Sequence, residues 1–385
     1  MAKKDTSSKH VSVDPKVGRD ELAELLANEL NKANKDSGKI AYFLDEKDDP
    51  STVTDWISTG STSLDLAISN RPYGGLPVGR ITTLTGLEGT GKSLICAHLV
   101  AETQKKGGMA VYIDTEAAAA PEFWTALGVN LKDMLYLSQD TLESSFQNIE
   151  NIIGVVRKSN SDRLCTIIMD SIAGASTKME LEANYERKGF ATGKALIVSE
   201  AMRKLTNLVA KRRILLVFTN QLRQNLAAMA FGDKWVEPCG KATSFHSSVK
   251  VRFETIEKLK NSDKEVIGVH TRATVRKNRL GPPFKSAEFE VYFDSGIADY
   301  ASWIELAKKK GFITGPSNGL LYNGEKYNTD SFVKKLNTDN VFKDNLYNKI
   351  CEAVIMQYKT PNSTVLENLT AEPEDSDSTK VIEEE

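Results

Sequence analysis

The sequence lacks any long, uninterrupted apolar run. No stretch of its 385 residues approaches the roughly 18–20 apolar residues that a membrane-spanning helix needs. The first ten residues are rich in Lys and Ser, and no apolar segment follows them, so a secretory signal is not expected. These two absences predict a cytoplasmic protein with no membrane partner.

Cysteine and histidine are both scarce, with four of each. Cys96, Cys165, Cys239 and Cys351 lie far apart and form no CxxC pair, which argues against a zinc site or a disulfide framework. Reduced thiols are the simplest expectation for such a chain. Cys96 and Cys165 sit within apolar runs, so we expect both in the core.

The chain also has little net charge, −2, but that charge is unevenly spread. Residues 367–385 hold eight acidic residues and one lysine, a net charge of −7, which leaves +5 on the rest of the chain. An acidic tail on a mildly basic body is compatible with a nucleic-acid partner. It is equally compatible with a solubilising end, so charge alone leaves both alternatives open.

Near the start of the chain, four leucines recur at helical spacing, at Leu22, Leu25, Leu26 and Leu30. Asp20 and Glu21 precede them, which suits a helix N-terminus. The polar stretch that follows, residues 35–54, contains too little apolar surface to fold alone. We therefore expect this helix to pack on another surface, such as a neighbouring subunit.

The central region alternates short apolar runs with helical patterns. The expected strands are Ile81–Thr85, Met109–Asp114, Thr166–Asp170 and Ile214–Asn220, and the expected helices are Ser93–Lys105, Leu142–Arg157 and Leu196–Arg212. Three later strands, Ser248–Ile256, Val266–Lys277 and Ala287–Phe293, have no long helices between them. This order predicts an α/β fold, with a mainly parallel sheet covered on both faces and an antiparallel extension.

Composition divides the chain into four parts. Residues 1–55 are expected to be a disordered start, a helix and a linker, and residues 56–300 the α/β core. Residues 301–360 are expected to form a small α+β C-terminal domain, and residues 361–385 an acidic disordered tail.

The strongest motif follows the first of these strands and matches GxxxxGK[ST]. It reads Gly86, Leu87, Glu88, Gly89, Thr90, Gly91, Lys92 and Ser93. Glycines let backbone N–H groups converge on phosphate oxygens, and the helix that follows presents its N-terminus to the same anion. The lysine neutralises the β- and γ-phosphates, and the serine hydroxyl is a ligand for Mg²⁺. ATP and Mg²⁺ are thus the expected cofactors.

Two other strands end in acidic residues. Asp170 ends its strand, where an acid beside a P-loop usually holds Mg²⁺, so Ser93 and Asp170 form the expected metal site. Glu116 follows the strand Met109–Asp114 and could polarise an attacking water. Its spacing fits a solvated acid at a strand end equally well.

The strand Ile214–Asn220 leads to Gln221, whose amide could sense the γ-phosphate and pass its loss to the next loop. That loop, residues 222–243, shows no clear periodicity. Loops of this length in compact domains are usually functional or disordered. Its basic and glycine residues suit a loop that grips a nucleic-acid strand. The segment 180–194 has similar composition.

Together these residues resemble the RecA family of recombinases. The resemblance rests on Ile57–Ser61, Ser63–Asp65 and Gly75–Arg80 leading into the P-loop, on Ile113–Glu116, Met169–Ser171, Ala201–Leu205 and Asn220–Arg223, and on Lys277–Arg279 and Pro283–Phe289. The matches run in the family's order from about residue 20 to residue 350. The sequence also resembles the UvsX-like phage branch of the family, for which the cytoplasm would be that of the host.

The resemblance implies roles for matching positions. Glu116 would activate the attacking water, and Gln221 would sense the nucleotide. Lys277 and Arg279 would reach across a subunit interface to the neighbour's γ-phosphate, and Phe123 would stack on adenine. The family's adenine-contacting Asp is replaced here by Ala120, which weakens the expected base selectivity.

The resemblance also implies the partners. The two loops would bind single-stranded DNA, through Arg203, Arg223, Leu226, Phe231, Gly240 and Lys241. The N-terminal helix would dock on the adjacent subunit of a helical filament, and the C-terminal domain would meet double-stranded DNA. Single-strand-binding or mediator proteins are further candidate partners. The implied function is a DNA-dependent ATPase that forms filaments on single-stranded DNA and catalyses homologous pairing and strand exchange in recombination and repair.

Three other functions share part of this pattern. A hexameric helicase motor would use the same core and a cation supplied in trans. A DNA-binding accessory protein with a decayed ATP site would have lost residues such as Lys92 or Glu116, which are present. A regulatory ATPase of the KaiC type would typically carry a duplicated core, and no internal repeat is found.

Overall fold

The computed structural model describes residues 20–35, 39–46, 49, 51–117, 119–159, 163–183, 191–210, 212–225, 234–239, 242–316 and 319–358. The chain forms two compact units, Met1–Thr54 and Asp55–Glu385. None of the described helices is long and apolar enough to cross a membrane. The four cysteines are free and buried, as predicted for Cys96 and Cys165.

The first unit contains helix α1 (Glu21–Ala33), in the predicted place. The Asp20 side chain caps it by accepting a hydrogen bond from the Ala23 N–H at 2.9 Å. None of its residues is buried, and the four leucines that motivated the prediction are 50–62% exposed. The helix therefore carries an uncovered apolar face.

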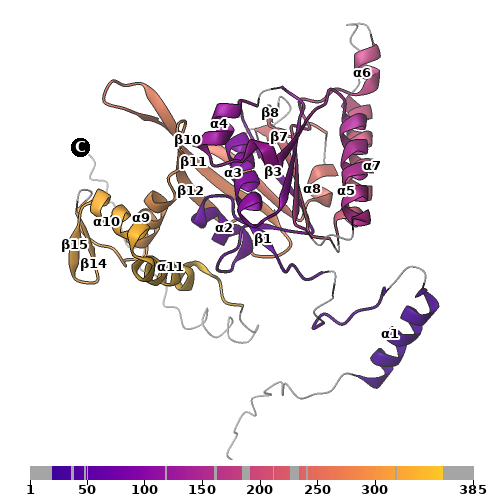
Figure 1. The fold of residues 1–385 in the computed structure, drawn as a ribbon, viewed down its shortest axis with the longest axis horizontal. Helices are drawn as coiled ribbons and strands as arrows, with labels where there is room; N and C mark the ends of the chain where they lie inside the picture. Colours follow the sequence, from indigo (N-terminus) through magenta and orange to yellow (C-terminus); the bar gives the residue numbers. More distant parts are fainter. Residues whose placement is uncertain are drawn as a thin grey trace, which may run out of the picture. The chain divides into compact units, whose positions relative to one another are not determined.

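The second unit is built on a nine-stranded sheet (Figure 1). Its strands are β3 (Ile81–Gly86), β4 (Met109–Asp114), β5 (Met134–Ser138), β6 (Cys165–Asp170), β7 (Ile214–Gln221), β10 (Val249–Lys260), β11 (Val266–Asn278), β12 (Ser286–Tyr292) and β13 (Gly296–Ile297), in the order β13-β12-β11-β10-β3-β7-β6-β4-β5. From β10 to β5 every neighbouring pair is parallel, and from β10 to β13 every pair is antiparallel. This confirms the predicted fold class.

Helices cover both faces of the sheet. The helices of this unit are α2 (Thr62–Ser69), α3 (Lys92–Lys105), α4 (Pro121–Ala126), α5 (Leu142–Lys158), α6 (Lys178–Glu182), α7 (Ala191–Val209), α8 (Ala242–His246), α9 (Asp299–Lys309), α10 (Thr329–Thr338) and α11 (Asn340–Val354), with a 3₁₀ turn at Leu131–Asp133. Side chains of α2 and α3 pack on one face, and those of α5 and α7 on the other. In β6, Ile167 and Ile168 point into opposite cores, which explains the continuous apolar run of that strand.

Some elements gave no clear signal in the sequence. Strand β5 was not predicted, and its side chains are partly or fully exposed because it lies at the edge of the sheet. The loop 222–243, expected to be irregular, begins with a short hairpin of β8 (Arg223–Gln224) and β9 (Trp235–Val236). A second small pair, β1 (Trp56–Ile57) and β2 (Leu76–Pro77), precedes the sheet.

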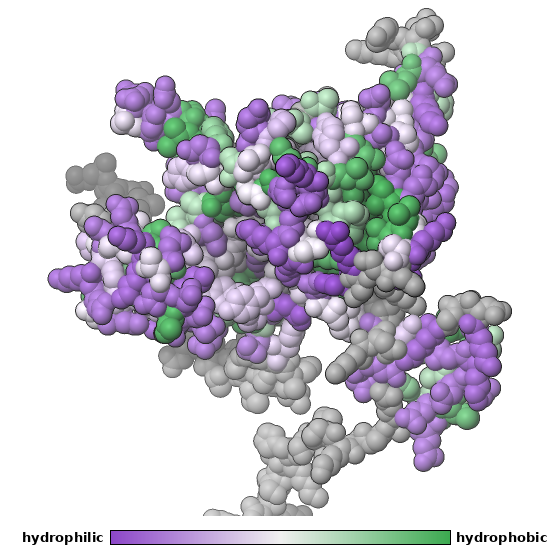
Figure 2. Space-filling view, in the orientation of Figure 1, coloured by the Kyte–Doolittle hydropathy of each residue, from purple (hydrophilic) through white to green (hydrophobic). Residues whose placement is uncertain are grey.

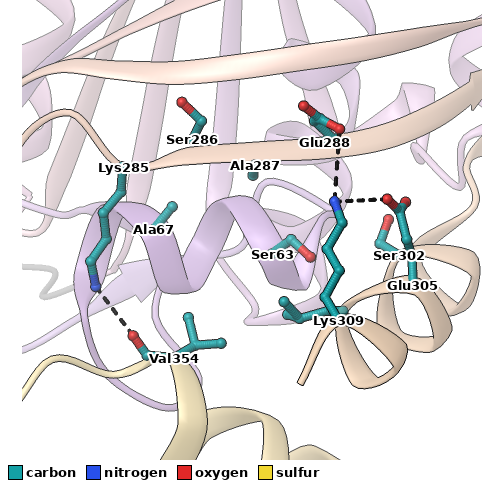
Figure 3. A pocket seen from close by; sticks show the side chains of 11 residues that line it. Ser63, Ala67, Lys285, Ser286, Ala287, Glu288, Ser302, Glu305, Lys309 and Val354 are labelled. Atoms are coloured by element: carbon teal, nitrogen blue, oxygen red, sulfur yellow. Dashed lines mark hydrogen bonds and ion pairs between the residues drawn. The ribbon is translucent and has the colours of Figure 1, made fainter. Parts of the chain in front are cut away.

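The C-terminal region contains α9, α10, α11 and the hairpin of β14 (Leu320–Tyr322) and β15 (Glu325–Tyr327), around its own apolar cluster. Leu66 of α2 belongs to the same cluster, so this region packs directly on the core. A cavity of about 280 Å³ lies along the junction (Figure 3). Across it, Lys309 of α9 bridges Glu305, at 2.9 Å, and Glu288 of β12, at 4.0 Å. The predicted division at residue 300 stays a prediction.

Candidate active site

The sheet topology gathers the residues of the main motifs at one edge. Strands β3, β7, β6 and β4 are consecutive neighbours and run parallel, so their carboxyl ends share that edge. The P-loop follows β3, Gln221 ends β7, Asp170 ends β6, and Glu116 comes two residues after β4. Ligands of open α/β sheets bind at this kind of edge.

The P-loop conformation depends on its glycines. Gly89 and Gly91 have φ values of 68° and 92°, a region that favours glycine. At Gly86 a Cβ would lie 2.8 Å from the Phe253 carbonyl oxygen and 2.7 Å from Thr90 Oγ1. Helix α3 begins at Lys92, directly after the loop, so its first N–H groups face the same place.

Lys92 is a buried cation inside this loop. Its Nζ donates hydrogen bonds to the carbonyl oxygens of Gly86, at 3.0 Å, and Leu87, at 2.7 Å. Burial lowers the pKa of Lys92, and the negative charges of Asp170 and Glu116 oppose that shift. The carboxylates thus favour the charged form that phosphate binding requires.

Ser93 and Asp170, the pair predicted to hold a metal, are in direct contact. Ser93 Oγ donates to Asp170 Oδ2 at 2.7 Å. Tyr112 OH donates to the same oxygen at 2.8 Å, and Thr219 Oγ1 donates to Oδ1. Asp170 is therefore fixed from its two neighbouring strands, β4 and β7, and from the P-loop helix.

Glu116 is exposed, but its carboxylate is held in place. Oε1 accepts a hydrogen bond from Ser171 Oγ at 2.7 Å and another from Gln221 Nε2 at 3.2 Å. Its backbone N–H donates to Asp114 Oδ1 at 2.9 Å. The second oxygen, Oε2, has no hydrogen-bond partner within the described part of the chain, which leaves it available to a water molecule.

These residues are suited to bind Mg²⁺ and a nucleoside triphosphate. The described residues contain no group of three or more His, Cys, Asp or Glu that could hold a metal ion. A magnesium ion in a nucleotide site does not need one, because it takes one or two protein ligands, phosphate oxygens and water. Ser93 and Asp170 would supply those ligands, beside the phosphate cradle that the P-loop would form.

Phe123, predicted to stack on adenine, lies in α4, two residues after the helix starts. Its ring is partly buried and packs against the core cluster that also contains Trp124. Ala120 immediately precedes this helix and is exposed, so no carboxylate occupies that position. The structure thus keeps an aromatic side chain near the carboxyl end of β4.

Lys277 and Arg279 lie far from the P-loop of their own chain. Strand β11 runs antiparallel to β10, and Lys277 pairs with Lys250, which pairs with Thr83. Thr83 is three residues before Gly86, or roughly 10 Å along the strand at about 3.3 Å per residue. The carboxyl end of β11 lies level with the amino end of β3, so both cations lie towards the amino ends of the parallel strands.

Both cations contact the end of helix α8. Lys277 Nζ donates to the carbonyl oxygens of Ser244, at 2.5 Å, and Phe245, at 3.0 Å. Arg279 Nη2 also donates to the Phe245 carbonyl oxygen at 3.0 Å. Burial lowers the pKa of Lys277 to about 8, with further lowering from the charges of Arg279 and Lys250.

The two arginines predicted to bind DNA lie on different elements. Arg203 is exposed on α7, and its charge, with those of Arg279 and Lys277, lowers the pKa of His246, which burial lowers most. Arg223 is exposed on β8, at the base of the loop 222–243. Leu226, Phe231, Gly240 and Lys241 lie outside the described residues.

Three side chains of the site were missed by the sequence analysis. Ser171 follows Asp170 directly, so its position beside the motif could have indicated it. Thr219 and Tyr112 lie inside apolar strands, and only the neighbouring positions of β7, β6 and β4 bring their hydroxyl groups to Asp170. No sequence signal distinguishes them from core residues.

Known proteins resemble this chain over most of its length. The sequence profile of the RecA N-terminal domain family matches residues 24–298. A RecA protein of Symbiobacterium thermophilum is 37% identical over 250 residues, covering 65% of this chain and 68% of that protein. RecA proteins of Heliobacterium modesticaldum and Latilactobacillus sakei are 32% and 33% identical over 307 and 311 residues, each covering 80% of this chain and 85% and 84% of those proteins.

The family profile spans more than half of the chain, including the P-loop, Glu116, Asp170, Gln221 and Lys277. The fold gathers the first four of these at one sheet edge, as described above. The chain therefore belongs to the RecA family of DNA recombinases.

Proposed function

We propose that this protein is a DNA-dependent ATPase that forms helical filaments on single-stranded DNA and exchanges that strand with a homologous duplex. The observation that carries the proposal is the separation of the P-loop from Lys277 and Arg279. A cation that lies towards the amino ends of the strands cannot complete a nucleotide site at their carboxyl ends in the same subunit. It can complete the site of a neighbour, which makes ATP hydrolysis depend on assembly.

The roles of the site residues follow from their contacts. Lys92 and the P-loop N–H groups bind the phosphates, and Ser93 and Asp170 would hold Mg²⁺. When bound, Mg²⁺ neutralises charge on the β- and γ-phosphates. Glu116 accepts a proton from the attacking water, with its carboxylate oriented by Ser171 and Gln221. Lys277 and Arg279 of the adjacent subunit stabilise the negative charge that develops on the γ-phosphate.

Two apolar surfaces support self-assembly. The four leucines of α1 are exposed, and no residue of this helix is buried. On the core, Figure 2 shows hydrophobic surface gathered beside α5, and exposed apolar side chains in this part of the chain include Leu135 and Val155. Exposed apolar patches of this kind mark protein interfaces. We propose that α1 docks on the core of the next subunit.

DNA is bound through exposed cations. Arg203 and Arg223 would contact phosphates, together with the predicted Leu226, Phe231, Gly240 and Lys241 of the second loop. Binding of this kind is independent of sequence and weakens as salt rises. Base pairing between the bound strand and the duplex then supplies specificity. The cytoplasmic location predicted from the sequence stays a prediction.

The decisive experiment measures ATP hydrolysis with and without single-stranded DNA, for the wild type and Lys277→Ala. Lys258→Ala, an exposed lysine at the far end of β10, is the matched control. We expect DNA to stimulate the wild type and the control but not Lys277→Ala. Hydrolysis that ignores both DNA and Lys277 would refute the proposal.

A strand-exchange assay separates the recombinase from the second candidate, a hexameric helicase motor, which shares the P-loop and a cation supplied in trans. The recombinase pairs a single strand with an intact homologous duplex and forms filaments. The helicase would instead unwind a duplex with a single-stranded tail and form rings. The uncovered apolar face of α1 favours the filament.

A further inference from the structure

A second cavity lies away from the P-loop, between the core and the C-terminal region. It has a volume of about 570 Å³. Its walls come from β1, α2 and the end of α3 on the core side and from α9 and α11 on the other. Nothing in the mechanism proposed above uses these residues.

The indole of Trp56 lines this cavity with an unpaired donor. Trp56 is only 6% exposed, and its Nε1 is buried without a hydrogen-bond partner. A buried N–H group without an acceptor is costly, and such groups are uncommon in folded proteins. A bound molecule with an acceptor atom would satisfy the indole N–H group.

Further aromatic side chains line the same cavity and contact one another. The rings of Tyr300 and Trp303 lie 5.4 Å apart, as do those of Trp303 and Tyr347, and Tyr73 stacks on Tyr347 at 4.8 Å. Tyr73 remains 74% exposed, so much of its ring is free. Flat aromatic surfaces of this kind bind planar rings, above all nucleobases.

Two carboxyl groups, the buried Asp65 and the half-buried Asp299, form part of the same lining. Their described partners are all neutral: Ser58 and Thr59 donate to Asp65, and Thr62 and Trp303 donate to Asp299. Burial raises the pKa of both groups, that of Asp65 to about 7. Asp65 Oδ2 and Asp299 Oδ1 each accept one hydrogen bond from the described residues, so each can accept another from an N–H group of a base.

Three lysines lie around the cavity. Lys105 is paired with Glu102 at 2.6 Å, and Lys106 with Asp55 at 3.0 Å. Lys343 of α11 has no ion pair within the described residues. An unpaired cation beside an aromatic cavity is placed to contact a phosphate.

We propose that this cavity binds one nucleotide unit, with its base against the aromatic side chains, an acceptor atom on the Trp56 N–H and its phosphate near Lys343. This site is separate from the P-loop. The same chemistry has two sources, a free nucleoside monophosphate and a nucleotide within a DNA strand. The proposal does not depend on the recombinase function, because it rests on the cavity alone.

Photo-crosslinking tests the proposal on the full-length protein. One arm uses 5-iodo-2′-deoxycytidine 5′-monophosphate, and the other uses a single-stranded oligodeoxynucleotide with one 5-iododeoxycytidine. Labelled peptides are mapped by mass spectrometry. Mapping separates this site from the P-loop site, where Phe123 of α4 is the residue predicted to stack on adenine.

We expect labels on Tyr73 or on the peptides that contain Tyr300, Trp303 and Tyr347. Trp56→Phe keeps the ring but removes the donor, and Lys343→Ala removes the cation from the helix surface. Each should raise the half-saturating concentration about fivefold, the effect of one lost hydrogen bond or ion contact. Lys334→Ala, an exposed lysine on α10 outside the cavity, should match the wild type.

The two arms identify the source. Labelling by the mononucleotide assigns the site to free nucleotides, and labelling by the oligonucleotide alone assigns it to DNA. Absence of label on these peptides in both arms overturns the proposal. Equal labelling in the wild type, Lys343→Ala and Trp56→Phe overturns it as well.

Discussion

The amide of Gln221 donates a hydrogen bond to Oε1 of Glu116 at 3.2 Å, across the carboxyl ends of β7 and β4. The next residue, Leu222, donates its backbone N–H to the carbonyl oxygen of Gly86, at the start of the P-loop, at 3.2 Å. The loop 222–243, which is proposed to bind DNA and begins with β8, follows immediately. Under the proposed function, a change at the γ-phosphate would have a short path, of two hydrogen bonds, to the base of the loop proposed to bind DNA.

Gln221→Ala should uncouple DNA binding from the nucleotide. In the wild type we expect single-stranded DNA to bind more tightly with an ATP analogue than with ADP, by about 5–150-fold as is usual for coupled sites. In the variant this ratio should fall towards one, as measured by fluorescence anisotropy of labelled DNA. Gln224→Ala, an exposed residue of β8, is the control and should keep the ratio. An unchanged ratio in Gln221→Ala would show that Gln221 does not couple the nucleotide to DNA binding.

Glu116→Gln should abolish hydrolysis while binding survives. The amide cannot accept the proton of the attacking water, so the turnover number should fall about 10²–10⁴-fold. Nucleotide binding, DNA binding and filaments should persist, because the phosphate contacts come from Lys92 and the P-loop. Phosphate release and electron microscopy check both parts. Glu122→Gln, exposed at the start of α4, should behave as the wild type. Normal turnover in Glu116→Gln would contradict the assigned role.

DNA-dependent hydrolysis should decline in alkaline solution. The pKa of Lys277 is lowered from 10.5 to about 8, so its charge is present below pH 8 and is lost as the pH rises through that value. For stability the sign is opposite: burying charged Lys277 costs free energy below pH 8, and that cost disappears as the pH approaches 10.5.

The pH profile of kcat/KM for DNA-dependent hydrolysis checks this prediction. In Lys277→Arg, any activity that remains should not decline near pH 8, because a guanidinium stays protonated. The same alkaline decline in both proteins would assign it to another group.

Replacing two leucines of α1 should prevent filament formation. Leu25→Ser with Leu26→Ser removes two exposed apolar side chains, each contributing about 1.5–3 kcal/mol when buried at an interface. Sedimentation should show smaller species and electron microscopy no filaments, with nucleotide binding retained. Lys32→Ser lies on the same helix and should assemble normally. Filaments of normal length in the leucine variant would exclude α1 from the interface.

The sequence by itself determined the fold class and predicted the residues of the nucleotide site. Buried parallel strands appear as continuous apolar runs, so β3, β4, β6 and β7 could be located from composition and spacing. The P-loop and the acid at the end of β6 are local patterns, whose chemistry depends on a few adjacent residues. The edge strand β5 was not predicted, because its side chains are largely exposed and its sequence lacks a continuous apolar run.

Only the tertiary structure decided which residues meet. Tyr112 and Thr219 meet Asp170 because β4 and β7 lie on either side of β6 in the sheet, an order that differs from the order of the chain, and Ser93 reaches it from the start of α3. The same topology places Lys277 away from its own P-loop, since β11 runs antiparallel to the strands that carry the site. The cavity beside Trp56 joins residues more than 200 positions apart, and no local pattern encodes such a junction.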